Sequence, residues 1–361
     1  ANKPAPDGKG IQDHYADMWR HIAKRFAGSN TVIGYDLMNE PFNGSQGSQI
    51  IPVMLGSYAA LYARETGKVY SEKELLDIWG NEESRMKALE WMSDARRYAA
   101  VISSATELNS SFERNELHSM YQHVADRIRE VDTTHILFLE HAYFSNTGVR
   151  SGVRPVNRPD GTEDPLVAYA AHGYDLLVDT KYYGQSSIER VDYIFSQIRA
   201  VADSINRPVI IGEWGAFPGN SDEAAVISQA TMNLLEKYRF SQTYWAFHDG
   251  IEKTPTFVKS FNRPYPRYIN GTLVSSQFNY SNGEFSCKWE ESPEVNGSTV
   301  IFVPDLKSLV REKIILTPGN QNIIIEPVQG GGGAYIIIPG SGTKGERSVS
   351  VTLEEYFSSI K

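Results

Sequence analysis

The feature that most constrains the fold is a set of five short, almost continuously apolar segments in the first 250 residues. They are Val32–Glu40, His135–His141, Pro165–His172, Pro208–Gly215 and Gln242–Asp249. Apolar runs without polar alternation are typical of strands that a parallel sheet buries on both faces. Helical patterns lie between the runs, with Ser187 and Ser221 as candidate N-caps of two of them. Strands that alternate with helices predict parallel β/α units.

Polar and aromatic residues gather at the carboxyl ends of all five segments. They are Asn39 and Glu40, Glu140 and His141, His172 and Tyr174, Glu213 and Trp214, and Trp245, His248 and Asp249. In a parallel barrel all these ends meet on one face, where the active site lies. In an open doubly wound sheet only the ends at the switch point bind a ligand. The pattern therefore favours an α/β fold of the (β/α)8 TIM-barrel type.

The number of strands is lower than a complete barrel requires. A (β/α)8 barrel has eight strands, whereas the sequence offers five before the composition changes near Asn262, and residues 12–27 resemble a helix that leads into the first of them. We therefore expect this chain to carry about the last five strands. The first three would be absent or would lie on a companion N-terminal fragment that completes the barrel.

Two further regions define the domain organisation. An insertion of about 44–115 follows the first strand and is too long for an ordinary βα loop; its helices either cover one rim of the site or pad the barrel. From Arg263 onward turn signals multiply, including Asn282-Gly283 between two strand-like stretches. We expect a C-terminal portion of a TIM barrel over residues 1–263 and an antiparallel β-sandwich over residues 264–361.

Composition argues against several kinds of partner. The chain has 35 Lys and Arg against 44 Asp and Glu, a net charge of −9, so we expect no nucleic-acid partner. The single cysteine, Cys287, excludes an intramolecular disulfide, and no cluster has metal-ligand spacing, so neither metal nor cofactor is expected. Five sequons favour an extracellular or secreted protein, at Asn43, Asn109, Asn270, Asn279 and Asn296.

The strongest chemical signal is the tripeptide Asn39-Glu40-Pro41 at one strand end and Glu213 at another, 173 residues further on. Glycoside hydrolysis needs two carboxyl groups, of which one protonates the leaving oxygen and the other attacks or activates water. Their surroundings must hold the two pKa values apart. Glu40 lies between apolar residues and Pro41, which suits an acid kept protonated, whereas Tyr174 is expected to donate to an ionised Glu213.

The segments IGYDLMNEPF and IIGEWGAF resemble the fourth and seventh strand signatures of glycoside hydrolase family five, a family of retaining (β/α)8 glycosidases. The resemblance implies that Glu40 is the acid/base and Glu213 the nucleophile. It also implies that Asn39 binds the sugar 2-hydroxyl, and His172 and Tyr174 match the family's His-x-Tyr. Trp245 matches the tryptophan that stacks under the sugar. From its position at a strand end, Trp214 is a further candidate for substrate binding.

Within that family the chain looks most like the endoglycoceramidase group, on the strength of the helical insertion, the Arg263-Pro264-Tyr265-Pro266 passage and the C-terminal sandwich. The resemblance implies a retaining endo-β-glycosidase that separates oligosaccharide from ceramide. Its partners would be a glycolipid or oligosaccharide substrate and a membrane surface. Alternatives are a β-glucan or mannan endo-hydrolase and a non-catalytic glycolipid-binding protein. The apolar segment Ile50–Tyr62 lines a lipid-binding surface in one interpretation and is a buried insertion helix in the other.

Overall fold

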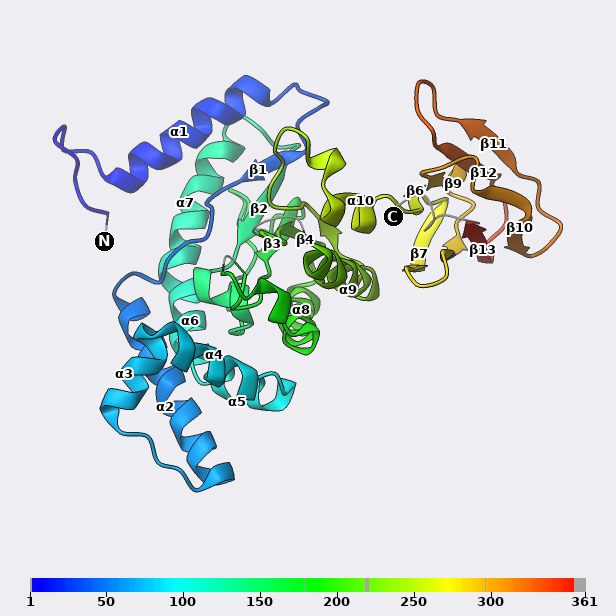
Figure 1. The fold of residues 1–361 in the computed structure, drawn as a ribbon. Helices are drawn as coiled ribbons and strands as arrows, with labels where there is room; N and C mark the ends of the chain where they lie inside the picture. The colour runs from blue at the N-terminus through cyan, green and yellow to red at the C-terminus, as the bar shows by residue number, and fades with distance from the viewer. Residues whose placement is uncertain (1, 179, 218–220, 296, 354–361) are drawn as a thin grey trace. The chain divides into compact units, whose positions relative to one another are not determined.

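The computed structural model describes residues 2–178, 180–217, 221–295 and 297–353. Contacts divide the chain into two units, Ala1–Ala216 with Phe240–Ala246 and Phe217–Arg239 with Phe247–Lys361. Each unit has a sheet structure of its own, parallel in the first and antiparallel in the second. Figure 1 shows the elements of both units by label.

The first unit is built on one parallel sheet in which the strands follow the order of the chain, β1-β2-β3-β4-β5. The strands are β1 Gly34–Asp36, β2 Ile136–Glu140, β3 Val167–His172, β4 Val209–Glu213 and β5 Ser241–Gln242. This order never reverses, as it would in a doubly wound sheet, and it is the order of neighbouring strands in a barrel. The predicted parallel β/α architecture is therefore confirmed. Four of the five predicted segments contain a strand, and the fifth overlaps its strand only at Gln242.

The fifth segment is shorter than predicted. Instead of a strand over 242–249, the structure has Ser241–Gln242, followed by a single parallel bridge between Gly215 and Trp245. The apolar residues beyond Gln242 are aromatic side chains at the strand end, and Tyr244 packs edge-on against Trp214 with ring centroids 5.2 Å apart. Their hydrophobicity serves this rim contact and not a doubly buried strand.

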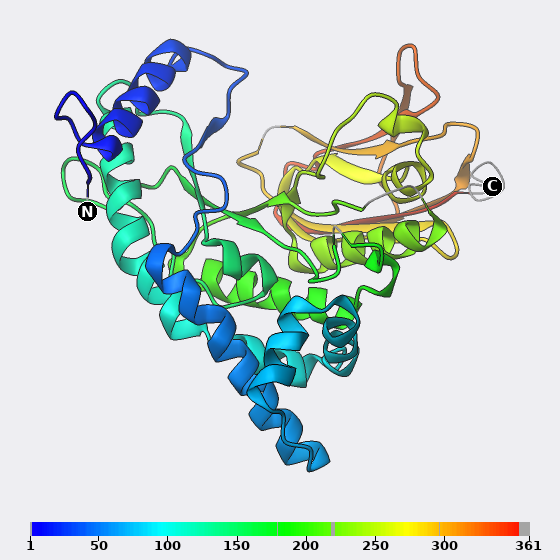
Figure 2. The ribbon, with the colours of Figure 1, turned by 60° about the vertical axis from the view of Figure 1, so that its left-hand side comes forward.

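Helices α1 (Ile11–Phe26), α7 (His118–Arg129) and α8 (Ile188–Ile205) belong to the same unit. Helix α1 packs along α7, and Figure 2 shows the two side by side. Ser187 caps α8 by accepting the N–H of Arg190, as predicted from the sequence. The apolar face of α8 is buried, with Ile194 and Phe195 fully enclosed.

The insertion after β1 is helical, as predicted. It comprises a short 3-10 turn, five α-helices and a π-helical turn: Gly44–Gln46, α2 Gly47–Thr66, α3 Glu72–Gly80, α4 Glu82–Trp91, α5 Ala95–Ser103, α6 Thr106–Phe112 and Glu113–Leu117. Tyr58, Tyr62, Tyr70 and Trp91 pack together with ring centroids 5.0–5.6 Å apart. This aromatic cluster gives the insertion a core of its own. No helix in the described ranges is long and apolar enough to cross a membrane.

The second unit contains α9 (Asp222–Tyr238), α10 (Pro255–Phe261) and two four-stranded antiparallel sheets, β10-β13-β8-β7 and β11-β12-β9-β6. Their strands are β6 Tyr265–Tyr268, β7 Gly271–Asn279, β8 Glu284–Glu291, β9 Ser298–Val303, β10 Leu309–Thr317, β11 Ile324–Pro327, β12 Ala334–Pro339 and β13 Gly345–Leu353. Side chains from both sheets, among them Phe285, Trp289, Ile301 and Ile336, form one buried core. The predicted antiparallel C-terminal fold is confirmed for the strands up to Leu353, and Asn282-Gly283 does connect β7 to β8.

The sequons differ in their accessibility. Asn43, Asn109 and Asn270 are buried, and the amide groups of Asn43 and Asn109 bond to each other at 2.9 Å. Asn279 is exposed, whereas Asn296 lies outside the described residues. Buried amides are unavailable for glycosylation in the folded protein, so three of the five sequons lend no support to the expected secretory location.

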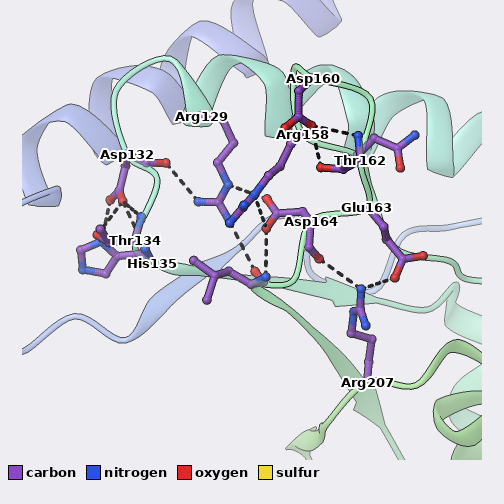
Figure 3. A network of polar contacts seen from close by, with 12 residues as sticks. Arg129, Asp132, Thr134, His135, Arg158, Asp160, Thr162, Glu163, Asp164 and Arg207 are labelled. Carbon is purple, nitrogen blue, oxygen red and sulfur yellow. Dashed lines mark hydrogen bonds and ion pairs between the residues drawn. The ribbon is translucent and has the colours of Figure 1, made fainter.

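A buried ion-pair network lies around the loop that enters β3 (Figure 3). Arg129, at the end of α7, contacts Asp164 at 2.6 Å, and both side chains are buried. Arg158 approaches the other oxygen of Asp164 at 3.6 Å, and Arg207 pairs with the neighbouring Glu163. The network lies at the amino ends of the strands, opposite the ends where the polar and aromatic residues gather, so we assign it a role in stability.

We predict that Asp164→Ala lowers the free energy of unfolding of the first unit by about 3–5 kcal/mol, because it leaves the Arg129 guanidinium buried and unpaired. Urea denaturation measures this loss. The matched control is Asp94→Ala, whose partner Arg96 is 93% exposed. Removal of such a surface ion pair costs about 1 kcal/mol or less. Asp94 also caps helix α5, and loss of that cap adds its own cost. Equal losses for the two variants would contradict the assigned importance of the buried pair.

Candidate active site

The ends of β1 and β4 bring the two predicted glutamates together. Glu213 is the last residue of β4, and Glu40 follows β1 with a backbone φ of 42°, which residues other than glycine rarely adopt. A carboxylate oxygen of each lies within 4.8 Å of the other and of a ring nitrogen of His172. This proximity matches the spacing of about 5–5.5 Å between the carboxyl groups of retaining enzymes and is too small for the inverting arrangement.

His172 is buried at the centre of the site. Its Nδ1 lies 3.0 Å from Glu40 and 3.4 Å from Glu213, and its Nε2 lies 3.2 Å from Glu140. Burial by itself lowers the pKa of this histidine, but the hydrogen bonds to Glu140 and Glu40 and the nearby carboxylate charges outweigh it and raise the pKa to about 10. At neutral pH the ring is therefore an imidazolium, and the carboxyl groups of Glu40, Glu140 and Glu213 surround its one positive charge.

Glu40, His172 and Glu213 also form a group close enough for metal ligation within the described ranges. Both ring nitrogens of His172, however, face carboxylate oxygens, and a protonated ring has no lone pair for a metal. The carboxyl groups of Glu40 and Glu213 are therefore better suited to pair with the His172 imidazolium than to bind a divalent metal ion.

Glu213 has the partner that the sequence predicts. The hydroxyl of Tyr174, two residues beyond β3, donates to Glu213 Oε2 at 2.9 Å. Burial raises the pKa of Glu213 and the charges of Glu40 and Glu140 raise it further, whereas His172 and the Tyr174 hydroxyl lower it. The pKa of Glu213 is raised on balance, because burial outweighs the donor and the imidazolium, which oppose it by favouring the ionised form.

Glu140 has a larger role than the sequence indicates. The sequence places it only among the polar residues at a strand end, but it is buried beside His172, and its Oε2 accepts the backbone N–H of Glu40 at 2.6 Å. This bond holds Glu40 at its positive φ, so the Glu140 side chain fixes both the imidazolium and the backbone of Glu40. A strand that ends in an acidic residue was the only sequence signal for it.

Asn146 was missed entirely. It lies in the 3-10 turn Tyr143–Thr147 after β2, and its Nδ2 donates to Glu40 Oε1 at 2.7 Å. His141 orients this amide, because its Nε2 lies 2.9 Å from Asn146 Oδ1, while its Nδ1 bonds the Tyr169 hydroxyl at 2.7 Å. No pattern in the sequence marks a single asparagine in a loop as a partner of a distant glutamate.

The remaining predicted residues differ in their placement. Asn39 lines a cavity of about 320 Å³ together with Glu140, His172 and Glu213. Asp36 also lines this cavity, whereas its neighbour Tyr35 is buried and bonds Asp132 at 2.6 Å.

Trp214 is wrongly predicted as a substrate-binding residue. It is 0% exposed, and its Nε1 donates to Gln242 at 2.7 Å, so its ring has no surface for a sugar. Successive side chains of a strand point to opposite faces, and the residue after Glu213 therefore points away from the site. Trp245 is 52% exposed and bonds the backbone of Trp214, which leaves its ring available for the stacking role that stays a prediction.

The helical insertion is tied to the loop that carries Asn146. The hydroxyl of Tyr98 in α5 donates to the carbonyl of Thr147 at 2.7 Å, and the Asn109 amide of α6 donates to Ser145 at 2.8 Å. Glu113 in the π-helical turn accepts the N–H of Ala142 at 2.7 Å, and burial raises its pKa to about 7 in spite of such bonds. These contacts fix the turn on both sides of Asn146.

The same insertion is tied to the loop that carries Tyr174. Asp175, the next residue, forms a bidentate buried ion pair with Arg190 at 2.7 and 3.0 Å. Arg190 also donates to the carbonyl of Leu89 in α4 at 2.9 Å. Of the two interpretations left open by the sequence, simple padding is therefore the weaker one, because the insertion holds loops whose residues contact Glu40 and Glu213.

Two adjacent carboxyl groups beside the strand ends, with a cation between them and a tyrosine donor, are the arrangement that retaining glycoside hydrolysis requires. The family model described as cellulase (glycosyl hydrolase family 5) matches residues 1–250, and the model of the glycoside hydrolase family 5 C-terminal domain matches residues 263–351. The chain belongs to glycoside hydrolase family 5. The family resemblance expected from the sequence is thereby confirmed.

Solved structures with similar folds include endo-glycoceramidase II from Rhodococcus sp., at 20% identity and a TM-score of 0.65, covering 95% of this chain and 65% of that one. The same enzyme in a ganglioside GM3 complex matches at 20% identity and a TM-score of 0.64, covering 95% and 64%. An endogalactoceramidase matches at 17% identity and a TM-score of 0.52, covering 95% and 62%. The chain thus spans about two thirds of the length of these proteins or slightly less. A search of curated proteins finds no significant match.

We predict that Glu140→Gln moves the alkaline limb of the pH–activity profile to lower pH and reduces kcat. The raised pKa of His172 means that its ion pairs are complete below about pH 6.5 and are lost as the pH rises toward 10. Removing one carboxylate lowers that pKa, so the imidazolium is lost earlier on the alkaline side. The control is Glu83→Gln on the exposed face of α4, which is expected to leave the alkaline limb in place. An unchanged alkaline limb in Glu140→Gln would contradict the role of Glu140 in keeping His172 protonated.

We predict that Tyr98→Phe lowers kcat more than it changes KM, because loss of the bond to Thr147 loosens the turn that presents Asn146. The matched control is Tyr280→Phe, which removes a similar hydroxyl-to-carbonyl bond, to Ser260 at 2.6 Å, in the second unit. Both variants are expected to lose about 1 kcal/mol of stability, measured by thermal unfolding. If the two also lose kcat equally, the effect on Tyr98 is not specific to the site.

Proposed function

We propose that this chain is the C-terminal part of an endo-β-glycosidase that releases the oligosaccharide of a glycosphingolipid from ceramide. The observation that carries the proposal is the pairing of Glu40 and Glu213 within 4.8 Å around the protonated His172. Sugar binding alone needs no such pair, which argues against a non-catalytic glycolipid-binding protein.

The reaction follows from the contacts of the two glutamates. Glu213, held by Tyr174, attacks the anomeric carbon while Glu40 protonates the departing oxygen. Glu40 is then a carboxylate, and the donors Asn146 and His172 stabilise that form. It next removes a proton from the water that hydrolyses the glycosyl-enzyme, so both carboxyl groups return to their initial states. Asn39, on the cavity wall beside them, is the candidate partner of the sugar 2-hydroxyl.

Apolar surface next to the carboxyl pair supports a lipid aglycone. Phe42, two residues after Glu40, and Tyr143, three residues after β2, are both exposed, and their ring centroids lie 5.9 Å apart. Helix α2 begins beside the Phe42 ring and is buried at Ile50 but exposed at Val53. The segment Ile50–Tyr62 thus serves both interpretations, with one side in the insertion core and the other available to a lipid chain. The ganglioside complex of a protein with this fold is consistent with such a substrate.

We further propose that a companion N-terminal segment supplies the other barrel strands. Among the described strands, β1 pairs only with β2 and β5 only with β4. Ile33 at the start of β1 is 66% exposed, and the inner-face residues Phe138 and Ile210 line the open cavity. A complete barrel packs such positions with side chains from the remaining strands. The extracellular or secreted location expected from the sequence is part of the same proposal.

The deciding experiment is product analysis by mass spectrometry after incubation with a ganglioside and, separately, with soluble β-glucan and mannan, using the chain with and without its N-terminal companion. We predict intact oligosaccharide and ceramide from the ganglioside, no cleavage of the soluble polysaccharides, and loss of turnover in Glu213→Gln with Glu107→Gln as an exposed control. Cleavage of glucan or mannan alone would favour the β-glucan or mannan endo-hydrolase. Full activity of Glu213→Gln would remove the nucleophile assignment.

A further inference from the structure

The outer face of the sheet β11-β12-β9-β6 carries a row of aromatic side chains. Tyr265 on β6 lies opposite Phe302 on β9, and Phe302 lies opposite Tyr335 on β12. Their ring centroids are 5.0 and 5.9 Å apart. The alternate residues Ile301 and Ile336 point into the core, so the aromatic row faces outward.

A second, aliphatic row runs beside the first. Tyr268 pairs with Val300, Val300 with Ile337, and Ile337 with Ile324. Tyr268 is 59% exposed and Ile324 is 54% exposed, while Val300 and Ile337 between them are half-buried. We call these two rows together the β6–β11 face.

The other sheet of the same sandwich shows that this composition is not required by the fold. The central strands β8 and β13 present polar residues outward, in the paired positions Lys288 with Ser348 and Ser286 with Ser350. Outward residues of β-sandwiches are ordinarily polar, and an extended exposed apolar surface marks a binding site. The difference between the two sheets therefore points to a ligand of the β6–β11 face.

The face also holds a cation. The guanidinium of Arg267 lies over the rings of Tyr335 at 4.8 Å and Tyr268 at 5.4 Å and donates to the Tyr335 hydroxyl. Apolar rows that combine tyrosine with a guanidinium match the boundary of a lipid bilayer, where apolar groups meet phosphates. The aromatic faces also attract quaternary ammonium groups.

We infer that the β6–β11 face docks on the phosphocholine surface of a zwitterionic bilayer, with Arg267 at the phosphates and the aromatic rows among the choline groups and upper acyl chains. A glycan fits less well, because the rings are tilted by 39° and 57° to one another and the aliphatic row offers no hydrogen bonds. The net charge of −9 disfavours anionic lipids. The inference rests on the proposed function in that a glycosphingolipid substrate lies in such a bilayer.

The test is co-sedimentation of the full chain with phosphatidylcholine vesicles. We expect binding by the unmodified protein and a loss of affinity of about tenfold or more in the double variant Tyr268→Ser/Ile324→Ser, because both side chains then bury less apolar area. The control is Ile315→Ser, which removes an exposed isoleucine from the polar sheet and is expected to bind normally. Circular dichroism verifies that all three proteins are folded.

Several outcomes overturn the inference: equal binding by the double variant, binding to anionic vesicles alone, complete competition by free phosphocholine, or a dimer that the double variant abolishes without any vesicle binding. Hydrolysis distinguishes this inference from the proposed function. The double variant is expected to cleave detergent-dispersed ganglioside normally but vesicle-embedded ganglioside more slowly. No cleavage of either form by the unmodified protein, with vesicle binding intact, would count against the proposed function and leave the docking face standing.

Discussion

The interaction on which the site depends is the placement of one buried imidazolium among three carboxyl groups. His172 contacts Glu40, Glu140 and Glu213, and its pKa of about 10 keeps it charged throughout the neutral range. Without that charge, ionised carboxyl groups at this distance would repel one another more strongly, and neither an ionised Glu213 nor the carboxylate that Glu40 becomes after giving up its proton would be stabilised. The histidine thus allows two glutamates to approach as closely as a double displacement requires.

The surrounding structure is organised to keep these groups in place. Glu213 ends β4 and has the rigidity of the sheet, and Glu40, four residues beyond β1, is held by the bond from its backbone to Glu140. Asn146 and Tyr174, in contrast, lie in loops that need support from outside. Tyr98 and the Arg190–Asp175 ion pair provide that support through the helical insertion. Catalytic geometry is sensitive to displacements of about 1 Å. We therefore expect these buried contacts to influence the catalytic rate, although they do not touch the two glutamates.

Much of this arrangement was predictable because it depends on local pattern. Apolar runs that end in polar residues indicated the parallel strands, and the same ends located Glu40, Glu213, His172 and Tyr174. The prediction that Trp214 binds substrate was wrong, because the hydrophobic pattern shows where a strand ends but not toward which face of the sheet its next residue points. Asn146 could not be predicted, since only the path of the turn after β2 brings it to Glu40.

The β6–β11 face shows a further limit of sequence patterns. The strands of the sandwich were foreseen, but whether Tyr265, Phe302 and Tyr335 form one row depends on the register between strands that are distant along the chain. A shift of one residue would have placed these rings in the core. Tertiary pairing, and not composition, therefore decides where the exposed surface becomes apolar.

The central claim is that Glu213 forms a covalent bond to the sugar across the gap from Glu40. Trapping with an activated 2-deoxy-2-fluoro glycoside, followed by peptide mass mapping of the active protein, measures this most directly. The account predicts one added glycosyl group on the peptide that contains Glu213. A label on a different residue, or turnover with inverted product and no covalent adduct, would contradict it.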